Sequence, residues 1–374
     1  MSLYINGRFL CQPLSGVQRY AGSLLDALDA LLDADVALRA RLGAVQALHP
    51  PGPLRRPEWR HIALCEVAGA QGHVWEQVAL LRRARHGLLL SLCNSGPLGH
   101  PRQVLALHDA HIWRQPESFA WRYRQWHRLL RPRLARRAAR LLTVSRFSAG
   151  ELGRCLDLSA EDFAIVGNGA DHLDHLADHP AALAQLDLPR AGFLLCVGNL
   201  SPNKNLVRLV AAHRLAGERL PELVIVGAAA PGVAHSALSA APRLRLLGRV
   251  SDAVLRGLYA RADGFVFPSL NEGFGIPPLE AMACGTPVLA ARAGALPEVL
   301  GPAAHWCDPR DVNDMARALC DFCAMSQAQR RALVAKGRAR AARFTWARAA
   351  RALSAELLAL AEPLPGQLAL RRPA

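Results

Sequence analysis

The chain has 374 residues, of which 51% are hydrophobic, so it is long enough to bury the cores of two domains. It shows no charged-then-apolar leader and no apolar run near the ~18 residues of a spanning helix, which predicts neither a signal peptide nor a transmembrane segment. Nine cysteines without regular spacing argue against a disulfide framework and predict a reducing, cytoplasmic location.

The first half of the chain opens with a strand, a polar loop and a helix. Residues 3–5 are predicted to form the strand, and the helix is predicted to begin at about Val17. Helices separate several of the later strands, a pattern typical of a parallel sheet with crossover connections. These later strands are predicted at residues 88–92, 104–107, 141–144 and 164–166.

A basic stretch at residues 121–140 holds eight arginines and no acidic residue, and so supplies more than half of the formal net charge of +15. Trp121, Tyr123 and Trp126 are interleaved at its start. Such a stretch suits the anionic surface of a membrane. An ordinary solvated helix face stays open as an alternative of equal weight, whereas nucleic acid fits less well.

The second half repeats the alternation of strands and helices, and both halves are therefore predicted to be α/β and doubly wound. The boundary is expected in the polar stretch 171–190, which gives domains 1–180 and 181–345. Thr345 is a predicted N-cap for a last helix from Trp346, so that residues 346–374 form a helix and a loose tail. The strands of the second half are predicted at 193–197, 223–226, 244–246, 264–267 and, last, 287–290.

Residues 268–289 are the most informative stretch of the chain. Glu272 and Glu280 lie eight residues apart, with two glycines and the pair Pro277-Pro278 between them. Glycines permit a close approach of a ligand to the backbone, and prolines are tolerated where a helix begins. We predict a loop that becomes a helix at about Pro277 or Pro278, with its amide groups facing a phosphate. The two carboxylates would hold hydroxyls at two places along a nucleotide sugar.

This stretch resembles the Glu-x7-Glu motif of the retaining GT-B glycosyltransferases, a family (glycosyl transferases group 1) that includes bacterial mannosyltransferases. The resemblance continues in residues 197–205, 246–252 and 295–299, and extends more loosely over most of residues 1–350. It implies two Rossmann-like domains that face a central cleft. Residues 1–180 would lie on the acceptor side, residues 181–345 would bind the nucleotide sugar, and the last helix would cross back to the first domain.

Lys204 stands out because the chain has 43 arginines and only two lysines. A compact ammonium suits a phosphate, although a solvated loop lysine is the plain alternative. The family usually carries an arginine near this lysine, where this sequence has Asn199 and Asn203. The remaining positive charge is expected from Arg249 or from helix N-termini.

The resemblance also assigns roles to individual residues. Glu272 would contact the donor sugar, and Glu280 would contact the ribose hydroxyls. His108, which follows the apolar run 104–107, would lie beside the donor sugar at the reaction centre, although a lone histidine is often structural. We therefore predict His108, Lys204 and Glu272 as the catalytic residues. The predicted donor-binding residues are Gly16, Asn199, Lys204, Arg249, Val250, Gly273, Phe274, Gly275 and Glu280.

No cofactor and no catalytic metal are predicted, because no His/Cys cluster has ligand spacing. Cys320 and Cys323 form a lone Cys-x-x-Cys inside a helical pattern and are expected to pack there.

The sequence and the resemblance thus predict a cytoplasmic, metal-independent glycosyltransferase, and the resemblance implies that it retains the anomeric configuration. If the basic stretch binds a membrane, the protein would be peripheral on the inner face of the cytoplasmic membrane. It would move a hexose, with mannose from GDP-mannose as the first choice, to a lipid-linked or polymeric saccharide in lipopolysaccharide or exopolysaccharide assembly. A sugar-nucleotide epimerase on a similar fold is the enzyme alternative, but such enzymes lack this Glu-x7-Glu context. An arginine-rich nucleic-acid-binding protein would explain the charge but not Lys204, Glu272 and Glu280, so no nucleic acid is expected as a partner.

Overall fold

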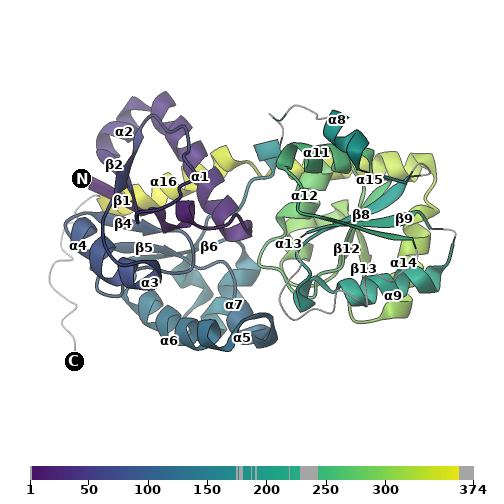
Figure 1. The fold of residues 1–374 in the computed structure, drawn as a ribbon, viewed down its shortest axis with the longest axis horizontal. Helices are drawn as coiled ribbons and strands as arrows, with labels where there is room; N and C mark the ends of the chain where they lie inside the picture. Colours follow the sequence, from purple (N-terminus) through teal and green to yellow (C-terminus); the bar gives the residue numbers. More distant parts are fainter. Residues whose placement is uncertain are drawn as a thin grey trace.

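The computed structural model describes residues 2–173, 176, 180–186, 188–189, 192–218, 220–227 and 243–361. In this part of the chain two parallel sheets, each covered by helices, lie side by side (Figure 1). The predicted fold class, an α/β protein of two doubly wound domains, is confirmed.

The first sheet has seven strands in the order β3-β2-β1-β4-β5-β6-β7. Strands β4 and β5 are buried along their whole length, which explains why they read as continuous apolar runs in the sequence. The strands are β1 (Ser2–Asn6), β2 (Ala44–His49), β3 (Ile62–Glu66), β4 (Leu88–Ser91), β5 (Gln103–Ala106), β6 (Arg140–Thr143) and β7 (Phe163–Ile165).

Helices cover both faces of this sheet. Helix α1 buries a stripe that includes Tyr20, Leu24 and Leu28, spaced four residues apart. A π-helical turn, η2 (Glu76–Leu80), lies between two short helices. The helices of the first domain are α1 (Gly16–Ala34), α2 (Val36–Leu42), α3 (Gly72–Trp75), α4 (Leu81–Ala84), α5 (His111–Arg114), α6 (Trp121–Arg137) and α7 (Arg146–Leu156).

The second sheet has six strands in the order β10-β9-β8-β11-β12-β13. Its strands are β8 (Phe193–Val197), β9 (Glu222–Val226), β10 (Leu244–Gly248), β11 (Gly264–Phe267), β12 (Val288–Ala291) and β13 (His305–Cys307). The surrounding helices are α8 (Pro180–Gln185), α9 (Leu206–Ala216), α11 (Asp252–Arg261), α12 (Ile276–Ala283), α13 (Leu296–Leu300), α14 (Val312–Cys323) and α15 (Gln327–Ala341).

The prediction that the strand at 287–290 is the last one is wrong, because β13 follows it at the edge of the sheet. Only three residues long and partly exposed, β13 lacks the apolar run that marks a buried strand. Strands β2 and β3 were not predicted either, and β3 forms the outer edge of the first sheet.

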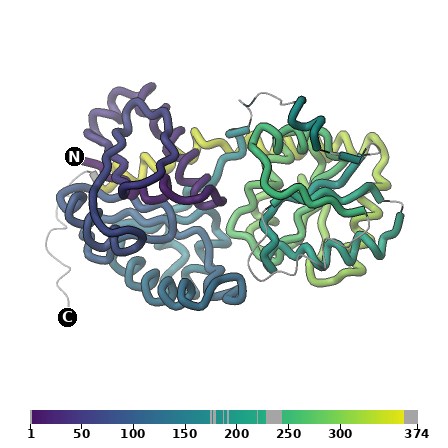
Figure 2. Tube along the Cα trace, in the orientation of Figure 1, coloured from purple at the N-terminus to yellow at the C-terminus, as the bar shows by residue number. Residues whose placement is uncertain are grey.

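The last helix, α16 (Trp346–Ala361), runs from the second domain back to the first and packs along α1 (Figure 2). Thr345 caps it as predicted, because its Oγ1 accepts a hydrogen bond from the Arg348 amide at 3.2 Å. The predicted tail lies outside the described residues. The division at residue 180 stays a prediction: β7 ends at Ile165, β8 begins at Phe193, and only part of the chain between them is described.

Candidate functional site

The loops that follow the strands of the two sheets meet between the domains, where ligands of doubly wound folds bind. The two domains are in direct contact at Gly273, on the loop after β11. Its carbonyl oxygen accepts hydrogen bonds from Ser145 Oγ (2.6 Å) and Ser148 Oγ (3.0 Å) of the first domain. A Cβ atom at Gly273 would lie 2.6 Å from the carbonyl oxygen of His108, so this position requires glycine.

Lys204 and Glu272, predicted from separate parts of the sequence, form an ion pair. The distance from Lys204 Nζ to Glu272 Oε1 is 2.6 Å, and Nζ lies 5.0 Å from the centre of the Phe267 ring. Both side chains remain partly exposed, at 20% and 12%. The ammonium is therefore held by one carboxylate beyond the C-terminal ends of the strands and stays accessible to an anionic ligand.

Glu280 is buried in the first turns of α12, which begins at Ile276 rather than at a proline. Its Oε2 accepts a hydrogen bond from the Tyr259 hydroxyl at 2.8 Å, and its Oε1 lies 3.0 Å from His172 Nε2. Burial and the neighbouring Glu280 carboxylate raise the pKa of Tyr259, so the phenol stays protonated and donates. A carboxylate has four acceptor positions, which leaves room for ribose hydroxyls.

Gly275 and Phe274 have structural reasons for their identities. Gly275 precedes α12 with φ of 100°, and a Cβ atom there would lie 2.5 Å from the Leu296 side chain. The Phe274 ring is buried and packs edge-on against Phe344, with 5.6 Å between the ring centres. The Phe274 side chain is thus committed to packing, and the contact of the backbone of this segment with a donor stays a prediction.

His108 is buried behind the Gly273 contact, with its ring edge-on to Tyr20 at 4.6 Å. Its Nε2 lies 2.7 Å from the carbonyl oxygen of Leu92. A carbonyl can only accept, so Nε2 carries the proton and Nδ1 is the free acceptor. Burial lowers the pKa of His108, which keeps the ring neutral near pH 7. The residue is therefore suited to hydrogen bonding and not to carrying a positive charge.

Gly16 begins α1 and faces open space, because no atom lies within 4 Å of a Cβ atom built there. Asn199 is exposed and accepts a hydrogen bond from Ser201 Oγ at 2.9 Å. Arg249 is exposed and Val250 is half-buried on the loop after β10. Gly16 lies at the start of a helix, and the other three residues lie on loops at the C-terminal ends of strands. Their contact with a donor stays a prediction.

Two contacts between the domains were missed in the sequence. Arg19 forms a bidentate ion pair with Asp252, at 2.8 and 2.6 Å. Burial favours a raised pKa for Asp252, but the Arg19 guanidinium outweighs it and holds that pKa below its usual range. Glu298 accepts hydrogen bonds from the amides of Arg146 and Phe147, and so caps α7 from the other domain. No local pattern marks such partners, because they lie about 150 or more positions apart.

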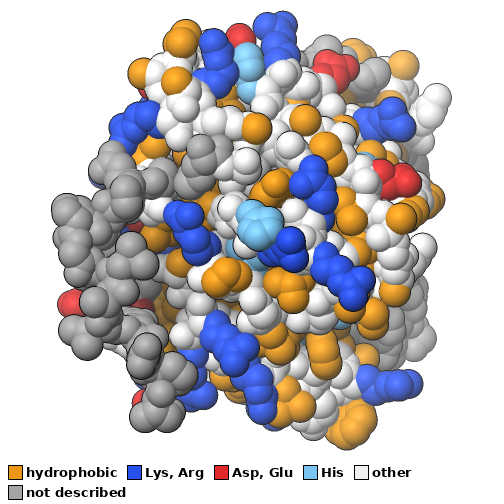
Figure 3. Space-filling model, turned by 90° about the vertical axis from the view of Figure 1, so that its left-hand side faces the viewer, with side chains coloured by type: hydrophobic (Ala, Val, Ile, Leu, Met, Phe, Trp, Pro, Cys, Tyr) orange, Lys and Arg blue, Asp and Glu red, His pale blue; other side chains and the backbone are white. Residues whose placement is uncertain are grey.

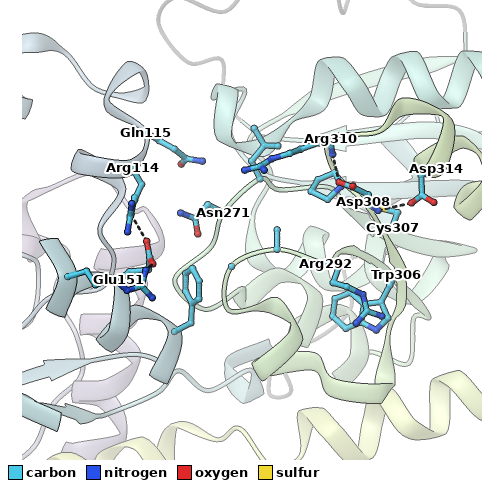
Figure 4. A pocket seen from close by; sticks show the side chains of 16 residues that line it. Arg114, Gln115, Glu151, Asn271, Arg292, Trp306, Cys307, Asp308, Arg310 and Asp314 are labelled. Carbon is cyan, nitrogen blue, oxygen red and sulfur yellow. Dashed lines mark hydrogen bonds and ion pairs between the residues drawn. The ribbon is translucent and has the colours of Figure 1, made fainter. Parts of the chain in front are cut away.

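A hollow of about 980 Å³ opens between the domains, lined on one side by α5 and α7 and on the other by the loops after β11, β12 and β13. Gln115 and Asn271 lie where the two domains approach, and Arg292 lies against Trp306, with 5.2 Å to the ring centre (Figure 4). Arg114 pairs with Glu151 on the first domain at 2.5 Å. The hollow adjoins Glu272 through Asn271 and is large enough for a sugar-sized ligand.

Comparison with known proteins defines the class. Residues 191–324 match the family model described as glycosyl transferases group 1. The chain is 34% identical to O-antigen chain mannosyltransferase B of Escherichia coli over 259 residues, which cover 66% of this chain and 67% of that protein. It is 33% identical to the MMP alpha-(1->4)-mannosyltransferase of Mycolicibacterium hassiacum, over 64% of this chain and 58% of that protein.

Solved structures show the same fold over nearly the whole chain. Sucrose-phosphate synthase of Thermosynechococcus elongatus superposes with a TM-score of 0.72 at 20% identity, covering 96% of this chain and 98% of that one. WaaG, a glycosyltransferase involved in lipopolysaccharide biosynthesis, superposes with a TM-score of 0.66 at 15% identity, covering 96% and 99%. The protein is therefore a glycosyltransferase with the GT-B fold. It belongs to the glycosyl transferases group 1 family.

Proposed function

We propose that the protein is a retaining mannosyltransferase. It transfers mannose from GDP-mannose to a lipid-linked or polymeric saccharide in the assembly of a bacterial surface polysaccharide. The Lys204–Glu272 ion pair carries this proposal, because Glu272 directly precedes Gly273, whose backbone lies against His108 of the first domain. Support for the sugar comes from relatives named as mannosyltransferases, two of them for O-antigen.

The residues of the site divide the reaction between them. Lys204 stabilises the negative charge that grows on the departing diphosphate. His108 accepts a hydrogen bond from a donor-sugar hydroxyl through Nδ1, because Nε2 is committed to Leu92. Glu272 positions Lys204 and the donor sugar. The acceptor hydroxyl attacks the anomeric carbon on the face from which the diphosphate leaves and passes its proton to an oxygen of the departing phosphate, so that the anomeric configuration is retained.

The donor is identified by thermal shift with GDP-, UDP-, dTDP- and ADP-sugars. A ligand at about 100 times its dissociation constant adds about 2.7 kcal/mol to stability, which makes the preferred base visible. Transfer from GDP-mannose to a soluble mannose oligosaccharide, with an α-linked product by NMR, is the expected result. If the protein instead epimerises the sugar nucleotide when no acceptor is present, it is an epimerase and the proposal is overturned.

We expect the reaction to proceed without a metal ion. Over the described ranges, no group of three or more His, Cys, Asp and Glu side chains is arranged to hold one. The Asp33-Ala34-Asp35 triplet serves the structure: Asp33 pairs with His61 at 2.8 Å, and Asp35 caps α2 through the Leu38 amide. The transfer rate in about 5–10 mM EDTA, which is a large excess over trace metal, should equal the rate without EDTA. Loss of transfer that Mg²⁺ or Mn²⁺ restores would show the mechanism to be wrong.

We also propose that the outer face of α6 binds an anionic membrane surface. This face is defined by Trp121 (65% exposed), Leu129 (58% exposed) and the exposed Arg133, Arg136 and Arg137. Figure 3 looks onto the end of the first domain, where basic side chains are scattered over the whole face and acidic ones lie near its edge. No helix among those described is both long and apolar enough to span a bilayer.

Replacing Arg133, Arg136 and Arg137 with glutamine should reduce binding to anionic liposomes in a sedimentation assay. Each basic residue near an anionic leaflet contributes about 1 kcal/mol, so three make a clear difference. The matched control replaces Arg261, Arg331 and Arg351, which are exposed elsewhere. Equal sedimentation of both triple variants and the wild type would mean that α6 is an ordinary solvated helix. Arg131, which lies in the same basic stretch, is only 2% exposed and is therefore not part of this group.

A further inference from the structure

Arg131 is a buried cation that forms no direct ion pair with a carboxylate among the described residues. Burial would raise the pKa of the nearby Asp109, but the charges of His111 and Arg131 hold it below its usual range, so Arg131 acts on this carboxylate only at longer range. Its guanidinium lies 6.0 Å from the centre of the Trp113 ring and donates a long hydrogen bond (3.4 Å) to the carbonyl oxygen of Asp109. The Asp109 carboxylate is occupied by His111, whose amide donates to it at 2.9 Å. A buried charge is costly unless it is paired. The chain thus places a positive charge next to the reaction centre and leaves most of its hydrogen-bonding capacity unused.

Arg131 is one of four residues on the inner face of α6, together with Arg124, His127 and Arg128. Their spacing of three, four and seven residues places them on one side of the helix. In the part of the chain that is described, Nε of each arginine and both ring nitrogens of His127 are buried without a hydrogen-bond partner. Burial and the charge of Arg131 lower the pKa of His127 to about 3, so this ring is neutral. Arg124 donates to the carbonyl oxygen of Pro116 at 3.4 Å, and Arg124 and Arg128 stay partly exposed. The accessible parts of these guanidinium groups have few acceptor atoms near them, and phosphate oxygens match them best.

An aromatic cluster adjoins this face. The ring of His127 lies 4.2 Å from that of Tyr123 and 5.3 Å from that of His73, and His73 lies 5.7 Å from Trp126. Tyr123 and Trp126 are 42% and 41% exposed. Exposed rings beside fixed polar groups suit a sugar, because one side of a pyranose ring is apolar and its rim carries hydroxyls.

Glu76 anchors the polar groups beside the aromatic cluster. It is fully buried at the start of the π-helical turn η2, a feature frequent at functional sites. Its Oε1 accepts from Asn6 and Ser95 at 2.8 Å each and lies 3.2 Å from Arg8 Nε, while its Oε2 lies 2.8 Å from His73 Nδ1. Burial opposes ionisation, but the hydrogen bond from His73 and the charge of Arg8 hold the pKa of Glu76 below its usual range.

This carboxylate fixes two side chains that remain partly exposed, Arg8 at 15% and His73 at 27%. Both offer hydrogen-bonding groups in a set orientation, and the charge of Arg8 is already offset by Glu76. Fixed donors without excess charge suit hydroxyl groups, whereas the inner face of α6 suits an anion.

The residues that anchor these groups lie at the C-terminal ends of neighbouring strands of the first sheet. Asn6 ends β1, Ser95 follows β4 and His108 follows β5, and these strands are neighbours in the sheet. The Asp109 carbonyl oxygen that Arg131 contacts directly follows His108 in the chain. The inner face of α6 is therefore continuous with the reaction centre of the proposed transferase.

We propose that the aromatic cluster, Arg8 and the inner face of α6 form the acceptor site, and that the acceptor is a saccharide that carries a phosphate group. This inference rests on the proposed transferase function. The sugar ring stacks on Tyr123 and Trp126, its hydroxyls bind Arg8 and His73, and the phosphate binds the guanidinium groups of α6. Because the outer face of the same helix faces the membrane in our proposal, the phosphate of a lipid-linked saccharide would arrive at this position.

The test compares two soluble acceptors, mannotriose and mannotriose 1-phosphate, in transfer assays with the preferred donor. The phosphate is expected to lower KM for the wild type at least about tenfold, the effect of roughly 1.4 kcal/mol. In Arg128→Gln the two acceptors should have nearly equal KM values, whereas Trp126→Ala should raise KM for both acceptors. Arg82→Gln, an exposed arginine of α4 outside the proposed site, is the matched control and should leave both KM values unchanged.

The ratio of the two KM values is an internal control, because a general loss of activity cannot change it. Equal KM values for the two acceptors in the wild type, or a wild-type ratio in Arg128→Gln, would overturn the proposal. Loss of liposome binding in Arg128→Gln with an unchanged ratio would also overturn it, and would assign the face to lipid headgroups. If no donor binds and no sugar is transferred, the proposed function itself fails, which is a distinct result.

Discussion

Replacement of Lys204 by alanine is expected to lower the rate of sugar transfer by about 10²–10³-fold, the usual cost of losing one group that stabilises transition-state charge. The affinity for the free nucleoside diphosphate should fall much less, because charge on the leaving diphosphate grows only as the bond to the sugar breaks. The structure holds the ammonium 2.6 Å from Glu272 and leaves it partly exposed. Single-turnover rates and calorimetric titration of the nucleotide measure the two effects separately.

Two further variants sharpen this prediction. Lys204→Arg should recover only part of the rate, because a guanidinium fork does not reproduce the geometry of a compact ammonium. Lys336→Ala is the matched control: it removes the only other lysine, which is exposed on α15. A wild-type transfer rate in Lys204→Ala, or an equal loss in both alanine variants, would remove Lys204 from the mechanism.

Parts of the site whose residues are close in the sequence could be predicted from it. The stretch from Glu272 to Glu280 combines glycines, prolines and carboxylates within nine positions, and the structure shows the predicted loop and helix there. The buried strands were equally visible, because a central parallel strand must be apolar on both faces. Short edge strands such as β13 carry no such pattern, since half of their surface is in solvent.

Contacts between the domains could not be predicted in this way. The partners Arg19 and Asp252 are 233 positions apart, and neither lies in a pattern that specifies the other. Ser145 and Gly273 are brought together only when two separately folded sheets dock.

The basic stretch shows the same limit in another form. In the sequence its eight arginines look alike, and the stretch as a whole suits a membrane surface. The structure separates them, because Arg131 is turned inward against Trp113 while Arg133, Arg136 and Arg137 stay exposed. Which side of a helix is buried depends on what packs against it, and an arginine-rich helix lacks the apolar stripe that would reveal this.

Glu280→Gln is expected to weaken binding of the nucleoside diphosphate by about 1.5–3 kcal/mol, the value of a hydrogen bond to a charged group, or roughly 10–100-fold. The glutamine oxygen can still accept from Tyr259, which lies 2.8 Å from Oε2. Its NH2 group then faces His172 Nε2, a donor 3.0 Å from Oε1, so a modest fall in melting temperature is expected. Glu280→Ala should weaken binding similarly and also destabilise the fold by about 1–3 kcal/mol, because the fully buried Tyr259 hydroxyl loses its acceptor.

The pair of variants therefore separates a binding role from a structural one. If Glu280 contacts the ribose, both variants lose affinity, and the alanine variant loses more stability than the glutamine variant. Tyr259→Phe provides the converse control, since it removes the internal hydrogen bond and leaves the carboxylate free for the ligand; its affinity should match or exceed that of the wild type. Wild-type affinity in Glu280→Gln would mean that this buried carboxylate serves only Tyr259 and His172, and that the ribose is held by the loop after β10.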